Sequence, residues 1–105
     1  MFVIRDIMYC KPGKVRPMVD KFLAMSKLNE KLGMSKMRVM TDFCAERYWT
    51  VASEMEVASL EEFEKMMSGV MDGLDPEAMK EFETVMEGYH DLVVKGRREI
   101  YKLEG

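Results

Sequence analysis

Few side chains in this sequence could carry acid–base chemistry. His90 is the only histidine among the 105 residues, and histidine is the side chain whose ordinary titration lies near neutral pH. It follows Met86 by four residues and precedes Val93 by three, beside an apolar helical stripe. Its functional role would be a ligand or a proton carrier that lines a cavity. A half-buried histidine at a helix boundary is the interpretation we prefer.

Charged residues also stand in the middle of the expected strands. Arg5 and Asp6 interrupt an N-terminal apolar run, and Arg38, Asp42 and Glu54 interrupt two later runs. Buried charges have to be paired, because an unpaired one is costly. We interpret these residues as salt bridges between subunits. The functional alternative is that Arg5 or Arg38 binds an anionic substrate while Asp6 or Asp42 acts as a base.

Motifs for metals and nucleotides are missing from the sequence. A single histidine without a Cys-x-x-Cys pair argues against a zinc site. On a strand, the spacing Met34-x-x-Met37-x-x-Met40 alternates faces, so its sulfur atoms could not converge on copper(I). Six of the thirteen methionines instead fall in or beside helical core stripes, where methionine is adaptable filler: Met18, Met25, Met66, Met67, Met79 and Met86. No glycine-rich phosphate loop occurs, and we expect no metal and no cofactor.

The elements that position these residues follow from the hydrophobic periodicity of the first half. An apolar, β-branched run from Phe2 to Cys10 predicts a strand, which Pro12 and Gly13 end. Helical spacing then continues to about Leu32, where Gly33 suits a left-handed closing position. A hairpin is predicted next, with strands over Lys36 to Cys44 and Arg47 to Val57 around a turn at Ala45-Glu46.

The second half predicts two helices and a final strand. Ser59 and Glu62 form a capping box before a helix that weakens near Gly69. Asp75-Pro76 then starts another helix, whose stripe reaches Val93 and which Gly96 closes. A last short strand is expected over Arg98 to Leu103.

This order predicts one α+β domain over residues 1–105, with a ferredoxin-like βαββαβ arrangement and an extra helix before the last strand. Its sheet would be antiparallel, with helices on one face and the third strand between the first and the second. Cys10 and Cys44, both expected in strands, would then not face each other. Without a signal peptide, free buried thiols and a cytoplasmic location are expected.

Composition limits the partners. The net charge of −3 argues against a nucleic-acid partner, which would require a basic face. No apolar run is long enough to span a bilayer, so no membrane partner is expected. Both faces of the sheet nevertheless carry apolar side chains: Val51 and Met55 share one face of the third strand, and Tyr48 and Ala52 the other. A second copy packed sheet against sheet is the simplest cover, and a homodimer is predicted.

The first strand, Lys11-Pro12-Gly13-Lys14 and the helix with Val15, Met18, Val19 and Phe22 resemble the opening of dimeric α+β barrel proteins. That superfamily includes the NIPSNAP-like proteins and the antibiotic-biosynthesis-type monooxygenases. The segment from Gly96 through Glu99-Ile100-Tyr101-Lys102-Leu103-Glu104 resembles the NIPSNAP-like final strand. The resemblance implies a homodimer whose two sheets form a barrel, often with a small cavity beside the sheet. It transfers no catalytic set.

Haem-degrading members of this superfamily shape their pocket with an asparagine, a tryptophan and a histidine. The chain contains Asn29, Trp49 and His90, but Asn29 falls on the first helix rather than the first strand. Trp49, expected in mid-strand, is therefore interpreted as a large core or interface anchor.

The expected function is that of a NIPSNAP-like homodimer with a small hydrophobic molecule bound beside the sheet. The ligand-binding candidates are Trp49, Tyr9, Tyr48 and His90. One alternative is a cofactor-independent monooxygenase or isomerase for a small aromatic or polyketide-like substrate, with His90, Asp6 and Arg38 as catalytic candidates. The other is a non-catalytic structural or regulatory dimer.

Overall fold

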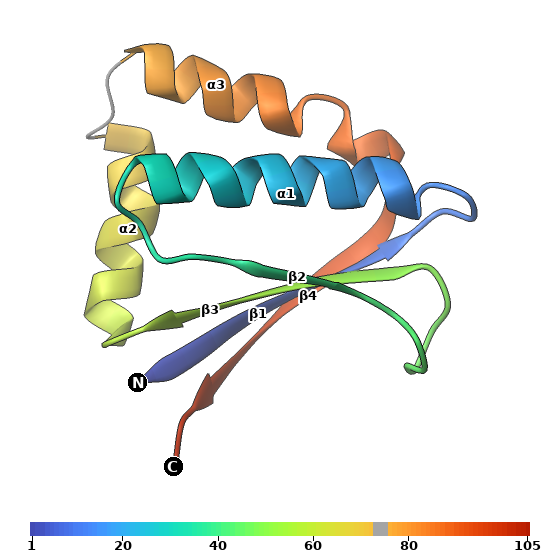
Figure 1. The fold of residues 1–105 in the computed structure, drawn as a ribbon, viewed down its shortest axis with the longest axis horizontal. Coiled ribbons are helices and arrows are strands. Elements are labelled where there is room, and N and C mark those ends of the chain that lie inside the picture. The colour runs from blue at the N-terminus through green and yellow to red at the C-terminus, as the bar shows by residue number, and fades with distance from the viewer. Residues whose placement is uncertain (73–75) are drawn as a thin grey trace.

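A computed structural model describes residues 1–72 and 76–105 of the chain, and Figure 1 shows them as one sheet with helices on one side. The elements follow in the order β1 (Phe2–Cys10), α1 (Val15–Lys31), β2 (Arg38–Thr41), β3 (Thr50–Val57), α2 (Leu60–Asp72), α3 (Pro76–Met86), the 3-10 helix η1 (Tyr89–Asp91) and β4 (Val93–Lys102). The predicted α+β order, including the extra helix before the last strand, is confirmed.

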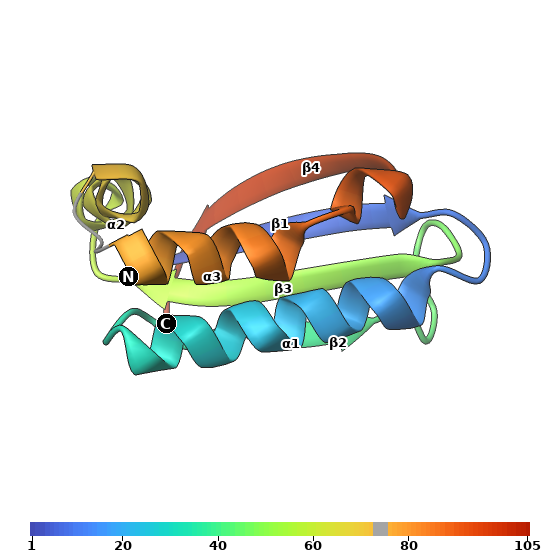
Figure 2. The same cartoon turned by 90° about the horizontal axis from the view of Figure 1, so that it is seen from above.

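The four strands form an antiparallel sheet in the order β2-β3-β1-β4. The third strand thus lies between the first and the second, as predicted. In β1, Ile4 pairs with Met55 of β3 on one side and with Ile100 of β4 on the other. Helices α1 and α3 run along the same face of the sheet, and α2 stands at one end of it (Figure 2).

Local signals account for the helix ends. Gly33 follows α1 with φ +74°, the left-handed conformation that glycine adopts without strain. The backbone N–H of Glu62 donates to Ser59 Oγ at 3.1 Å, and the Glu62 carboxylate accepts the N–H of Ala58 at 2.9 Å. The predicted capping pair is therefore present. Pro76 opens α3 as expected, whereas Asp75 lies outside the described residues.

The predicted hairpin is too long. β2 ends at Thr41 and β3 begins at Thr50, so the segment 42–49 is a loop and neither Cys44 nor Trp49 lies in a strand. Asp42 closes this loop, because its Oδ1 accepts the backbone N–H of Thr50 at 2.9 Å. Trp49 has φ +63°, a left-handed conformation that is incompatible with an extended strand.

The predicted end of the last helix is also wrong. α3 ends at Met86 rather than near Val93, because Gly88 takes φ +79° and turns the chain into η1. β4 therefore begins at Val93, earlier than expected. Gly96, which was expected to close the helix, lies within β4 opposite Met8, and a Cβ built there would lie 2.6 Å from the Met8 sulfur.

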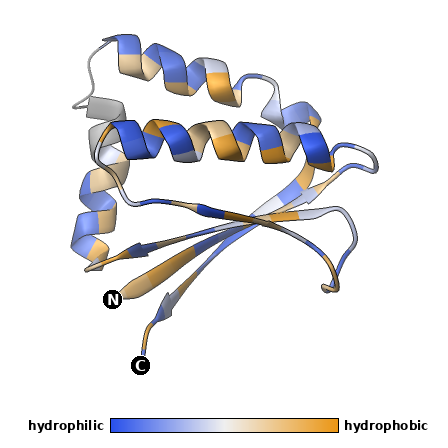
Figure 3. Ribbon diagram, viewed as in Figure 1, coloured by the Kyte–Doolittle hydropathy of each residue, from blue (hydrophilic) through white to orange (hydrophobic). Residues whose placement is uncertain are grey.

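The core fills the space between the sheet and the helices. Met18 of α1 and Val51 of β3 are 0% exposed, and they pack with Phe22 and Cys10 in one cluster. A second cluster joins Ile4 and Val57 to Phe63 of α2, and other apolar residues complete the two clusters. Hydrophobic and hydrophilic residues alternate along the helices and strands (Figure 3). No helix in the described part of the chain is long and apolar enough to cross a bilayer.

Candidate functional site

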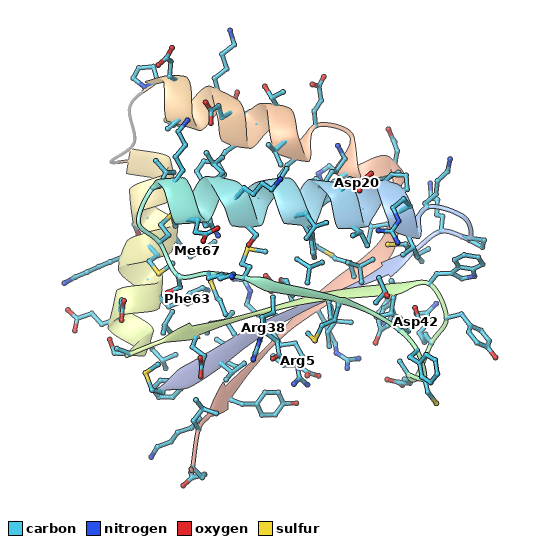
Figure 4. The ribbon with its side chains drawn as sticks, in the orientation of Figure 1. Arg5, Asp20, Arg38, Asp42, Phe63 and Met67 are labelled. Carbon is cyan, nitrogen blue, oxygen red and sulfur yellow. The ribbon has the colours of Figure 1, made fainter. Side chains whose placement is uncertain are left out.

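One face of the sheet carries no helix, and we call it the open face. Pairing register assigns a set of strand residues to it: Val3, Arg5, Ile7, Tyr9, Arg38, Met40, Thr50, Ala52, Glu54, Glu56, Lys95, Arg97, Glu99 and Tyr101. Alternation of side chains along each strand puts the core residues Ile4 and Met8 on the opposite, covered face. Arg5 of β1 and Arg38 of β2 lie on the side of the sheet away from the helices (Figure 4), with β3 between their strands.

The loop 42–49 forms one wall of a cavity on the open face. In Figure 1 this loop, which joins β2 to β3, lies beyond the sheet on the side away from the helices. The cavity measures about 510 Å³ and is lined by Arg5, Ile7, Tyr9, Met40, Thr41, Asp42, Phe43, Cys44, Ala45, Glu46, Arg47, Thr50, Ala52, Glu54 and Arg97. Tyr9 and Ile7 are only 4% and 8% exposed although no helix covers them. The site thus has an apolar floor beneath polar walls.

A single carboxylate organises one side of this cavity. Glu54 is 11% exposed, and its Oε2 lies 2.6 Å from Nη2 of Arg5. Its Oε1 lies 2.8 Å from Nη2 of Arg38 on β2. The two short, charge-assisted contacts tie three strands together through their side chains.

Arg97 organises the other side. Its guanidinium lies 3.0 Å from Glu99 and 3.7 Å from Glu46 of the loop, and its Nη1 donates to the Tyr9 hydroxyl at 2.6 Å. Desolvation lowers the pKa of Arg97, but the charges of Glu99, Tyr9 and Glu46 and the hydrogen bond to Glu99 outweigh it and raise the pKa above its ordinary value. The Tyr101 hydroxyl donates to Glu99, which raises the pKa of that phenol because the bond requires its proton.

Arg47 differs from the other arginines of the cavity. Its guanidinium carbon lies 4.6 Å from the centroid of the Tyr9 ring. Within the described residues, no carboxylate lies within 4.0 Å of this guanidinium, whereas Arg5 and Arg97 each have carboxylate partners. Arg47 thus has a cation–π contact and, among the described residues, no ion pair.

The ligand-binding candidates from the sequence separate into three places. Tyr9 lines the cavity on the open face. Tyr48 and Trp49 line a different hollow of about 410 Å³ beside Arg16, and Trp49 is too exposed to be a core residue. His90 lies in η1, exposed rather than half-buried as predicted, with its ring 3.9 Å from that of Tyr89.

The catalytic candidates are equally separate. Asp6 lies on the covered face and forms a 2.6 Å ion pair with Arg98, and this hydrogen bond raises the pKa of Arg98. Arg38 lies on the open face with Glu54, and His90 lies in η1. Asp6 and Arg38 thus lie on opposite faces of the sheet. Asn29 does not join Trp49 either. It lies near the end of α1, where its amide nitrogen is 3.2 Å from Met37 Sδ, whereas Trp49 shares a hollow with Val15 and Arg16 at the start of α1.

The two cysteines lie in different surroundings. Both cysteines are free, but only Cys10 is buried, because Cys44 lies in the loop and is exposed. Burial raises the pKa of the Cys10 thiol. In the described part of the chain, no group of three His, Cys, Asp or Glu side chains is positioned to hold a metal ion.

Another groove, about 670 Å³, is lined by residues of α1 and α3. Its polar lining consists of surface lysines and glutamates, and the Lys31–Glu81 ion pair at 3.6 Å spans it. Exposed pairs of this kind contribute little energy. The open-face cavity, with its buried floor, is the better candidate site.

Sequence reasoning named Tyr9, Arg5 and Arg38 for this region but missed Arg47 and Arg97. Strand register is the signal that identifies Arg97: it stands two residues before Glu99 on the same face of β4 and pairs opposite Ile7 of β1. Arg47 gave no such signal, since its position depends on the fold of the loop.

Comparisons with known proteins bear on the fold. No protein-family model matches the chain, and no curated protein is significantly similar in sequence. A NIPSNAP domain protein from Burkholderia xenovorans is similar in structure with a TM-score of 0.77 at 10% identity, over 100% of this chain and 96% of that one. A NIPSNAP family protein from Agrobacterium tumefaciens has a TM-score of 0.74 at 13% identity, over 96% and 90% of the two chains.

A third structure, a dimeric protein of unknown function with a ferredoxin-like fold from Bacteroides fragilis, has a TM-score of 0.61 at 14% identity. The alignment covers 97% of this chain and 96% of that chain. These likenesses confirm the ferredoxin-like fold and its resemblance to NIPSNAP domain structures. At such low identity they establish the fold alone.

Proposed function

We propose that the chain forms a homodimer through its open face and that the enclosed cavity binds a small apolar molecule. One observation carries this proposal: a cavity of about 510 Å³ lies on a helix-free sheet face above the buried side chains of Tyr9 and Ile7. Cavities of a few hundred Å³ with apolar walls and a few polar groups are typical of small-molecule sites.

The dimer is supported by apolar side chains that the single chain leaves exposed. Met40 and Tyr101 lie on the open face, and Phe43 and Tyr48 project from the loop beside it. Large exposed apolar patches mark interaction sites, and a two-fold contact between identical faces would cover them. The structurally similar Bacteroides fragilis protein is dimeric. Two free cysteines also fit the cytoplasmic location that we propose.

The enzyme alternative receives less support. Asp6 and Arg38 lie on opposite faces of the sheet and His90 lies in η1, whereas acid–base catalysis requires groups within hydrogen-bond reach of the same substrate. The purely structural dimer stays an outcome that the following experiment can identify.

The test combines oligomeric state with cavity filling. Light scattering at micromolar concentration should give the mass of two chains, and the uncharged fluorescent probe N-phenyl-1-naphthylamine should bind. Ala52 lines the cavity, so Ala52→Leu should reduce probe affinity at least tenfold. Ala58→Leu, at an exposed position before α2, is the matched control and should bind like the wild type.

Two results would contradict the proposal. The mass of a single chain would remove the dimer. A dimer that binds no probe, or whose Ala52→Leu variant binds it as well as the wild type, would remove the ligand site and leave a structural dimer.

A further inference from the structure

We propose that the open-face cavity takes an amphiphilic ligand with an anionic head group, a carboxylate or a sulfonate, and that Arg47 binds this group. The inference rests on the proposed function, because it specifies the ligand of the same cavity. It goes further by assigning a charge to the ligand and a residue to that charge.

The first argument is the uneven pairing of the cavity's arginines. Arg5 shares Glu54 with Arg38, and Arg97 lies close to Glu99 and Glu46. Arg47 has only the Tyr9 ring, with no carboxylate of the described residues within 4.0 Å. A guanidinium retains its charge at all ordinary pH values, so an anion-binding capacity is left unused at this position.

The carboxylates that line the cavity are already occupied. Asp42 accepts the backbone N–H of Thr50 and so closes the loop. Glu46 lies 3.7 Å from Arg97, and Glu54 binds two arginines. The three carboxylates of the cavity lining are therefore engaged with groups other than Arg47.

The geometry around Tyr9 favours a bound anion. The Arg47 guanidinium carbon lies 4.6 Å from the Tyr9 ring centroid, and a cation–π contact of this kind needs no N–H···O bond, so the N–H edge of the guanidinium stays available for one. That edge matches the two oxygens of a carboxylate or sulfonate. Arg97 lies 5.7 Å from the same ring centroid and donates to the Tyr9 hydroxyl, so a second cation lies on this side of the cavity.

Apolar side chains line the same cavity, among them Ile7, Met40 and Ala52. A ligand that contacts both regions needs an apolar body and one charged end. Closing the cavity against a second copy would also remove water from Arg47, and an unpaired charge in such a place is costly. An anionic ligand supplies the missing partner. A carboxylate of the second copy is the alternative partner for Arg47.

Two nearly identical probes test the proposal. 8-Anilinonaphthalene-1-sulfonate differs from N-phenyl-1-naphthylamine by its sulfonate, and both fluoresce when they bind apolar sites. In titrations of the intact wild-type dimer, the sulfonate probe should bind about tenfold more tightly, the factor expected for one charge-assisted contact. Arg47→Met retains an unbranched side chain but removes the guanidinium, so it should abolish this preference while it changes the affinity of the neutral probe less than twofold.

Arg16→Met is the matched control, because Arg16 is exposed and lies outside this cavity. It should change neither affinity. If both probes bind the wild type and Arg47→Met leaves their affinity ratio unchanged, the anion proposal is overturned while the proposed function stands. If Arg47→Met weakens the dimer tenfold and leaves the ratio unchanged, Arg47 pairs with the second copy, which also overturns it. If neither probe binds, both proposals fail together.

Discussion

The two faces of the sheet are made by the same strands but hold the molecule together in different ways. On the covered face, Met18 and Val51 are completely buried in an apolar core. On the open face, Glu54 and Arg97 organise ion pairs around a cavity. Apolar burial yields about 25 cal/mol for each Å² removed from water, whereas exposed ion pairs contribute little. The covered face therefore accounts for most of the stability, and the open face is available for recognition.

The division follows the alternation along each strand. In β1, Ile4 enters the core and its neighbour Arg5 binds Glu54 on the other face. A substitution in a strand should accordingly change mainly stability or mainly recognition, according to which face of the sheet its side chain lies on. Three predictions test this separation.

The largest difference is expected between two methionines. Met18 is 0% exposed and Met40, on the open face, is 38% exposed. Met18→Ala should lower the free energy of unfolding by about 2–5 kcal/mol, because it removes buried contacts and leaves a cavity. Met40→Ala should cost less than about 1 kcal/mol at dilutions where the chain is monomeric. Urea unfolding followed by circular dichroism measures both values.

The difference in unfolding free energy between Met18→Ala and Met40→Ala should also depend on dimer formation. If the open face pairs with a second copy, the cost of Met40→Ala should grow as protein concentration rises, since more of Met40 is then buried. Equal costs for the two variants at high dilution would mean that the faces do not differ in their contribution to stability.

A smaller difference is expected between two glutamates on the open side of β3. Glu54 holds Arg5 and Arg38, whereas Glu56 is exposed and has no ion pair within 4.0 Å in the described part of the chain. Glu54→Gln should cost about 1–2 kcal/mol, a value kept low by the exposure of both arginines. Glu56→Gln should cost less than about 0.5 kcal/mol.

Salt dependence distinguishes the origin of this effect. The cost of Glu54→Gln should shrink between low and high ionic strength, because salt screens the two partly exposed pairs. If the cost is independent of salt, or if Glu56→Gln proves the more harmful substitution, Glu54 does not organise the open face electrostatically.

The sequence predicted those features that depend on local periodicity. Alternation in β1 correctly separated Phe2, Ile4 and Met8 from Val3, Ile7 and Tyr9, and helical spacing located α1 almost to the residue. Element order was sufficient for the sheet topology. In each case the spacing of apolar residues, every two in a strand or every 3.6 in a helix, identifies the buried face of the element.

Contacts between distant segments could not be predicted in this way. The loop 42–49 alternates like a strand, yet the Asp42 carboxylate and the left-handed Trp49 fold it out of the sheet. Arg47 reaches Tyr9 only because of that fold. The candidate site was therefore half predicted: its strand residue Tyr9 was named, and its loop cation was not.

The last difference concerns reactivity, with no change in stability at neutral pH. Cys10 is buried on the covered side, and burial raises the pKa of its thiol, whereas Cys44 lies exposed in the loop. At pH 8 an aromatic disulfide reagent such as dithionitrobenzoate should modify one thiol per native chain and two after unfolding in guanidinium, because the thiolate is the reactive form. The native reaction should disappear in Cys44→Ser.

The pH dependence of stability should follow Cys10 with a definite sign. A thiol pKa that is raised on folding contributes stability that is fully present below the ordinary value of about 8.5, and this stability is lost as pH rises through the pKa of the folded state. Cys10→Ala should remove this alkaline loss, whereas Cys44→Ala should leave it intact.

Dilution of the protein should speed the modification of Cys44 alone, because dimer dissociation uncovers the open face and not the core. Equal acceleration at both thiols would show instead that dissociation loosens the whole domain, and that the two faces are not independent.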